Sequence, residues 1–141
     1  MRNNLIHKLI ILLILVMVFI LEILPNGAIL NFSDGTNIIK RTYSYFSLMP
    51  FGYANFGPLI TGVATIILML LIVFAIFKEH EKLFNSIKVV SIIGFAFSLL
   101  PLLLGINYYS FIGLIISVLL LIVVILVFLY KKNVYNNSNK N

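Results

Sequence analysis

Four apolar runs, separated by polar segments, divide the chain. They cover residues 9–24, 59–77, 89–104 and 111–130, and within them Glu22 is the one charged residue. As a helix, Leu59–Phe77 would be about 28 Å long, close to the roughly 30 Å of a bilayer's hydrocarbon core. The pattern predicts spans over about 5–24, 59–77, 89–106 and 111–130. The predicted fold class is an all-α integral membrane protein with four transmembrane helices in a single membrane domain, 1–141.

The first run follows two basic residues, Arg2 and Lys8, and so also has the form of a secretory signal peptide. Its apolar stretch exceeds the about 7 to 15 residues of a signal peptide. The candidate cleavage site, Asn26–Ala28, has Asn where a small residue is needed. These features favour an uncleaved first helix, which Pro25 and Gly27 should end because both residue types break helices.

A polar and aromatic loop of about thirty residues, 25–58, separates the first two runs. Asp34 and Gly35 lie between residues 29–33 and 36–40, and Asp-Gly suits the positive φ angles of a type I′ turn. This dipeptide predicts a small β-hairpin. The apolar alternation on either side is imperfect, so an irregular loop lying on the headgroups is the alternative.

The second half of this loop is rich in aromatic residues punctuated by Gly and Pro. Such rings settle between headgroups and acyl chains, which predicts an aromatic belt at the membrane surface. Aromatic rings held by tight turns also make rigid contacts, which predicts a recognition surface. The candidate interaction residues are Tyr43, Tyr45, Phe46, Phe51, Tyr53 and Phe56.

Two features interrupt the helical pattern beyond the second run. Pro101 cannot donate a hydrogen bond to the carbonyl of Phe97, so the end of the third span should bend, and Ser98 is placed to satisfy freed backbone groups. The tail, 131–141, is rich in Asn and Lys, and we expect it to be disordered.

Basic residues predict the orientation of the four spans. One side of the membrane would hold eight Lys and Arg residues, and the other side only Lys40 and Arg41. Because cytoplasmic segments carry the excess of basic residues, both termini should be cytoplasmic and the 25–58 loop external. The basic residues assigned to the cytoplasm are Arg2, Lys8, Lys78, Lys82, Lys88, Lys131, Lys132 and Lys140.

Composition excludes several classes of protein. Hydrophobic residues make up 62% of the chain and charged residues 10%, which is far too apolar for a soluble domain. The net charge is +6, but the basic residues flank the spans and form no stripe on a soluble module. A nucleic-acid partner is therefore not expected. Cysteine is absent, which removes disulfides, thiolate ligands and cysteine nucleophiles. Abundant Ile, Asn and Lys are typical of AT-rich coding sequences and favour a bacterial source.

Small residues spaced four apart predict where the helices pack, because they let backbones approach and hydroxyl groups bond across. The second, third and fourth spans each contain such a pair, and the first contains none. The pattern predicts a core built from the last three spans, with the first packed more loosely. The pairs are Thr61 and Thr65, Gly94 and Ser98, and Gly113 and Ser117.

Glu22 is the acidic residue inside an apolar run, and intramembrane carboxyl groups are candidates for function. It lies two residues from the end of the run, about 3 Å along the helix axis. At that depth we expect its carboxyl group to reach headgroups and water. A role in proton or cation coupling is the alternative.

No pattern of catalytic or metal-binding residues appears. Glu79, His80 and Glu81 are adjacent and therefore point in different directions from a helix, which suits a solvated connection better than a metal site. Nucleotide-binding, zinc-protease and nucleophile-elbow motifs are absent from the sequence. We expect no enzymatic activity, cofactor or metal.

Two resemblances bear on the architecture. Four spans with a glutamate in the first superficially resemble the small multidrug-resistance transporters, but those place the glutamate mid-span and use short loops, so the role of that residue is not transferred to Glu22. The sequence FGYANFGP, residues 51–58, resembles segments of small, uncharacterised four-span bacterial membrane proteins. That resemblance, over about residues 43–62, implies topology and no activity.

These observations predict a non-enzymatic membrane protein that acts as an accessory or interaction component, through its outer aromatic loop and its helix faces. The predicted partners are the lipid bilayer and a membrane protein or further copies of the chain. A small homo-oligomeric transporter or pore is the alternative function.

Overall fold

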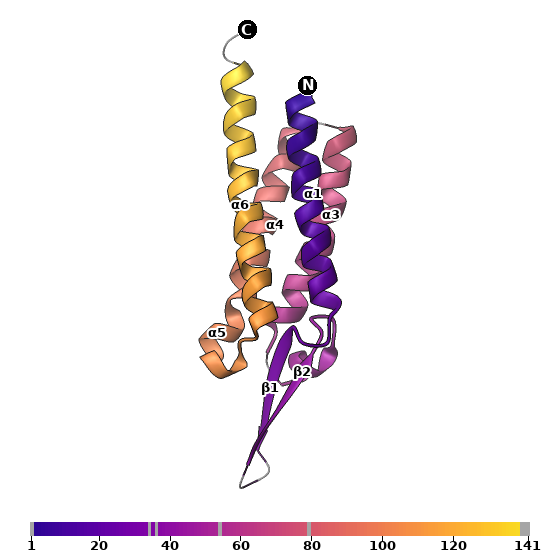
Figure 1. Cartoon of the computed structure of the whole chain (residues 1–141). Helices are drawn as coiled ribbons and strands as arrows, with labels where there is room; N and C mark the ends of the chain where they lie inside the picture. The colour runs from indigo at the N-terminus through magenta and orange to yellow at the C-terminus, as the bar shows by residue number, and fades with distance from the viewer. Residues whose placement is uncertain (1, 34, 36, 54, 79, 139–141) are drawn as a thin grey trace.

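Four long helices stand side by side, and a β-hairpin projects from one end of the bundle (Figure 1). The computed structural model describes residues 2–33, 35, 37–53, 55–78 and 80–138. All four long helices are long and apolar enough to cross a membrane, which confirms the predicted fold class. In chain order the elements are α1 (Arg2–Ile23), β1 (Ala28–Ser33), β2 (Ile38–Tyr43), α2 (Leu48–Gly52), α3 (Gly57–Phe77), α4 (Glu81–Ser98), α5 (Leu100–Leu104), the 3-10 turn η1 (Ile106–Tyr108) and α6 (Phe111–Ser138).

The four long helices form a closed ring in the order α1, α3, α4, α6. Helix α1 packs against both α3 and α6, so the prediction of a loosely packed first span is wrong. Its residues Ile11, Leu15 and Val18 are at most 1% exposed. Their spacing of four and three places them on one face of the helix, and large side chains on that face fill the core without a small-residue pair.

The core between the helices is mainly apolar. From α3, Leu68 and Ile72 meet the stripe on α1, and α6 contributes Ile116, Leu120, Val123 and Val127. The outward faces of the helices are also apolar, as a lipid-facing surface requires.

A β-hairpin lies between the first two spans, α1 and α3, as predicted, and α1 ends at Ile23, just before Pro25. Strands β1 and β2 are antiparallel, with Ser33 opposite Ile38 and Ala28 opposite Tyr43. Ser33 and Ile38 are the last paired residues of the hairpin. Of the predicted turn, Asp34 lies outside the described residues, whereas Gly35 has φ = +76°, which glycine adopts readily. We call β1, β2 and α2, residues 28–53, the hairpin module.

The predicted distortion near Pro101 is confirmed, because α4 ends at Ser98 and a separate short helix, α5, begins at Leu100. The Ser98 hydroxyl donates to the carbonyl of Phe95 at 2.6 Å, so the carbonyl it satisfies is two residues before that of Phe97, the one freed by Pro101. Gly57 at the start of α3 lies against this break. A Cβ atom at that position would be 2.7 Å from the carbonyl oxygen of Phe97.

Two helix boundaries differ from the predicted ones. Helix α4 begins at Glu81, well before the apolar run at Val89, so the connection after α3 is short. Helix α6 continues to Ser138, where a disordered tail was expected. No Gly or Pro follows Tyr130 to end that helix. Residues 139–141 of the predicted tail lie outside the described residues.

At the end of the bundle that holds both termini, Lys8 is 3% exposed. Its Nζ atom donates to the carbonyl oxygen of Ala75 at 2.6 Å, near the C-terminus of α3. Tyr130 of α6 stacks on Phe84 of α4 with ring centroids 4.6 Å apart. These contacts join α1 to α3 and α4 to α6 at this end, and the ammonium group suits the negative end of the α3 dipole.

Candidate functional site

The hairpin module is fixed to the bundle by Tyr45, which is 1% exposed. Its backbone N–H donates to the carbonyl oxygen of Glu22 at 2.9 Å, close to the end of α1. Its ring packs against Gly27 so closely that a Cβ atom there would be 2.8 Å from Cδ1. Burial raises the pKa of Tyr45 well above its usual value, so the phenol stays neutral.

Phe46 provides a second anchor. Its ring packs on Gly62 of α3, where a Cβ atom would be 2.8 Å from Cε1. It also meets Phe19 of α1 in an edge-to-face contact with centroids 5.7 Å apart. Tyr45 and Phe46 therefore enter the bundle and do not form part of a surface belt.

Glu22 is fully buried beside this anchor, which differs from the sequence-based expectation that its carboxyl group reaches headgroups and water. The hydroxyl of Thr65 donates to its Oε1 atom at 2.8 Å and also approaches the carbonyl of Thr61 at 3.1 Å. Among the described residues, Oε2 has no hydrogen-bond partner. Side chains on a helix lean toward its N-terminus, so Glu22, near the C-terminus of α1, leans back into the bundle.

A second set of polar contacts joins the segment between α1 and β1 to the start of α6. The hydroxyl of Ser110 donates to the carbonyl of Gly27 and accepts from the N–H of Gly113 at 2.8 Å. One turn deeper, the hydroxyl of Tyr109 donates to Ser117 at 2.6 Å. Ser117 in turn lies 3.3 Å from the carbonyl of Ser98 on α4. The predicted pair of Gly113 and Ser117 is thus buried and packed, and its hydroxyl group bridges two helices.

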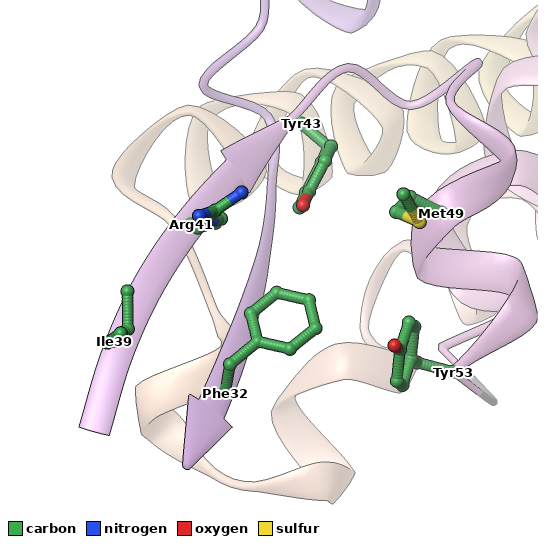
Figure 2. A pocket seen from close by; sticks show the side chains of 6 residues that line it. All are labelled: Phe32, Ile39, Arg41, Tyr43, Met49 and Tyr53. Atoms are coloured by element: carbon green, nitrogen blue, oxygen red, sulfur yellow. The ribbon is translucent and has the colours of Figure 1, made fainter. Parts of the chain in front are cut away.

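A pocket of about 310 Å³ opens between the hairpin and α2 (Figure 2). Ser47 caps the start of α2 by accepting a hydrogen bond from the N–H of Met49 at 3.3 Å. Phe32 and Tyr53 meet edge to face, with centroids 5.2 Å apart, and close one side of the pocket. The pocket is lined by Phe32, Ile39, Arg41, Tyr43, Met49 and Tyr53.

The six candidate aromatic residues therefore occupy three environments. Tyr45 and Phe46 anchor the module, while Tyr43 and Tyr53 line the pocket. Phe51 and Phe56 form an edge-to-face pair with centroids 5.0 Å apart and remain 43% and 41% exposed.

Sequence reasoning missed four lining residues: Phe32, Ile39, Arg41 and Met49. The alternation of side chains between the two faces of strand β2 was the signal that could have found the residues on that strand. Residues 39, 41 and 43 share one face of a strand, and the register places Phe32 opposite Ile39.

The described residues contain no group of three or more His, Asp or Glu side chains that could hold a metal ion. Of the predicted weak candidates, Glu79 lies outside the described residues, and His80 and Glu81 stand at the start of α4. Comparison of the chain with protein-family models, curated proteins and solved structures finds no match.

Proposed function

We propose that this chain is a non-enzymatic, multi-pass membrane protein that works as an accessory or interaction component. It binds a partner membrane protein through the exposed aromatic rings around α2, on the external side of a membrane whose cytoplasmic side holds both termini. The observation that carries this proposal is the anchoring of the hairpin module by Tyr45, which is 1% exposed, while Phe51 and Tyr53 stay 43% and 61% exposed.

The anchoring favours a recognition surface over a simple aromatic belt. A belt needs only rings that can reach the headgroup region, and a loosely attached loop would satisfy that requirement. Here Tyr45 and Phe46 are packed into the bundle, and Ser47 caps the helix that follows. The exposed rings are therefore held in one orientation, which lowers the entropy lost when a partner binds.

The alternative, a small homo-oligomeric transporter or pore, receives less support. A pore between copies needs a polar face along the spans. Every exposed side chain in residues 9–23, 59–77, 89–104 and 111–129, all of which the structure describes, is apolar. The buried polar groups near Glu22 are separated from Lys8 by the apolar layers of Leu15, Leu68 and Leu120.

Site-specific photo-crosslinking in native membranes tests the proposal. A photoreactive amino acid at Phe51 should give a discrete adduct with one partner protein, because this side chain projects from the anchored module. Phe77 is the matched control, since it is 80% exposed and lies at the far end of α3. The adduct should weaken in the Tyr53→Ala/Phe56→Ala background. Adducts with lipid alone, or the same protein adduct from both positions, would contradict the proposal.

A further inference from the structure

The pocket between the hairpin and α2 combines a guanidinium group with apolar and aromatic walls (Figure 2). Arg41 has no hydrogen bond or ion pair with any residue that the structure describes. Phe32, Ile39 and Met49 supply apolar surface beside it, and Tyr43 and Tyr53 add rings with hydroxyl groups. A cation beside an apolar wall suits a ligand that has one anionic end and one apolar end.

The strand register separates the two basic residues of the hairpin. Arg41 is opposite Leu30, and Lys40 is opposite Asn31. Because successive side chains of a strand point to opposite faces, Arg41 shares the face of Ile39 and Tyr43, whereas Lys40 lies on the other face. The sequence thus places one basic residue in the pocket and an adjacent one outside it.

The distance of Arg41 from the base of the hairpin is comparable to the thickness of a lipid headgroup layer. The hairpin continues along the long axis of the bundle beyond the helix ends (Figure 1). Arg41 is two residues above Tyr43 at the hairpin base, about 7 Å at roughly 3.4 Å per residue. The headgroup layer on each side of a bilayer is about 5 to 8 Å thick. With the hairpin base taken as the edge of the hydrocarbon core, this distance puts Arg41 in the layer of the lipid headgroups.

We propose that this pocket binds an amphiphile with an anionic phosphate headgroup. Arg41 pairs with the phosphate, as guanidinium groups do through two parallel hydrogen bonds, and the aromatic wall receives the adjoining apolar part. A volume of about 310 Å³ accommodates the headgroup and the start of a chain, while the rest of the chain stays in the leaflet. The inference goes beyond the proposed function, because it assigns a small-molecule ligand where that function requires a protein partner.

The test uses the full-length protein in detergent and native mass spectrometry to count retained phospholipids. Wild-type protein should retain one phosphatidylglycerol molecule in preference to phosphatidylcholine. Arg41→Gln should weaken this binding at least tenfold, because it removes the charge and the paired charge-assisted hydrogen bonds to the phosphate. Lys40→Gln makes the same change of charge on the opposite face and should bind as the wild type does. Tyr53→Ala removes a pocket wall with Arg41 intact and should also weaken binding.

A parallel titration with hexyl phosphate, below its micelle-forming concentration, distinguishes the source of the ligand. Selective lipid retention assigns the site to the leaflet, and binding of hexyl phosphate alone assigns it to a soluble anionic amphiphile. Equal binding by wild type and Arg41→Gln in both arms would overturn the proposal, and so would equal losses in Arg41→Gln and Lys40→Gln. Crosslinking through Phe51 is measured separately, so failure of either proposal is distinguishable from failure of the other.

Discussion

Glu22 and Tyr45 show how a loop can bury a polar residue near the end of a membrane span. A carboxyl group in an apolar interior requires hydrogen-bond partners, and Thr65 supplies one to Oε1. Tyr45 is hydrogen-bonded through its backbone to the carbonyl of Glu22, and its side chain lies in the same end of the bundle. The surroundings of Glu22 therefore include residues 23 and 43 positions later in the chain, Tyr45 at its backbone and Thr65 at its carboxyl group, and depth along α1 alone does not reveal them.

The buried phenol of Tyr45 predicts a loss of stability at alkaline pH. Its pKa is raised in the folded protein, mainly by burial, whereas an unfolded phenol ionises near pH 10. The folded state thus holds the proton more strongly, and this stabilisation is present below pH 10 and declines as the pH rises above it. Between pH 10 and 11 the decline amounts to about 1 kcal/mol.

The Tyr45→Phe variant provides the comparison, because it retains the packing of the ring and removes the ionisable group. Apparent melting temperatures in detergent, measured from pH 8 to 11, should fall more steeply for the wild type than for Tyr45→Phe. Parallel curves would show that Tyr45 does not contribute to the alkaline loss.

At the scale of elements, hydrophobic runs predicted the four spans, and helix breakers predicted the end of α1 and the break at Pro101. Local sequence patterns were sufficient for these features, because the length and apolarity of a run and the geometry of proline determine a helix without contacts to the rest of the chain. The position of α1 in the ring and the pocket at Arg41 depend on contacts between segments far apart in the sequence. The hairpin was predicted by Asp34 and Gly35, but the register with Ser33 opposite Ile38 depends on how both strands meet the bundle.

The contact between α3 and the break after α4 predicts the effect of a single methyl group. Gly57→Ala would place Cβ 2.7 Å from the carbonyl oxygen of Phe97, a backbone atom that cannot move without shifting α4. We expect a destabilisation of about 1 to 3 kcal/mol from this overpacking.

Gly52→Ala is the matched control, because a Cβ atom there meets nothing within 4 Å. The fraction of monodisperse protein after heating in detergent measures both variants. Gly52→Ala should retain the stability of the wild type or exceed it, since alanine restricts the unfolded chain. Equal stability of Gly57→Ala and wild type would show that the two helices separate more easily than their packing indicates.

At the scale of the whole molecule, the two ends of the bundle differ in character. Both termini and the connection after α3 lie at one end, and the hairpin module lies at the other (Figure 1). Of the eight basic residues predicted to be cytoplasmic, Lys140 lies outside the described residues, and the other seven belong to the helices and the connection at the first end. An apolar core joins the ends, so the orientation in a membrane is decided by the charges at each end and not by the packing between them.

Cysteine accessibility tests that orientation, and the chain suits the experiment because it contains no native cysteine. Ser33 lies at the far end of β1, and Ser86 lies on α4 at the end of the bundle that holds the termini. Both side chains are exposed, so a cysteine that fails to react is on the protected side of the membrane and is not buried in the protein. On intact cells, a membrane-impermeant maleimide should label Ser33→Cys and not Ser86→Cys, and Ser86→Cys should react once the cells are permeabilised. The reverse pattern would place the hairpin module in the cytoplasm and move the phosphate-binding pocket to the inner leaflet. Labelling of both positions on intact cells would contradict a bundle that crosses the membrane between them.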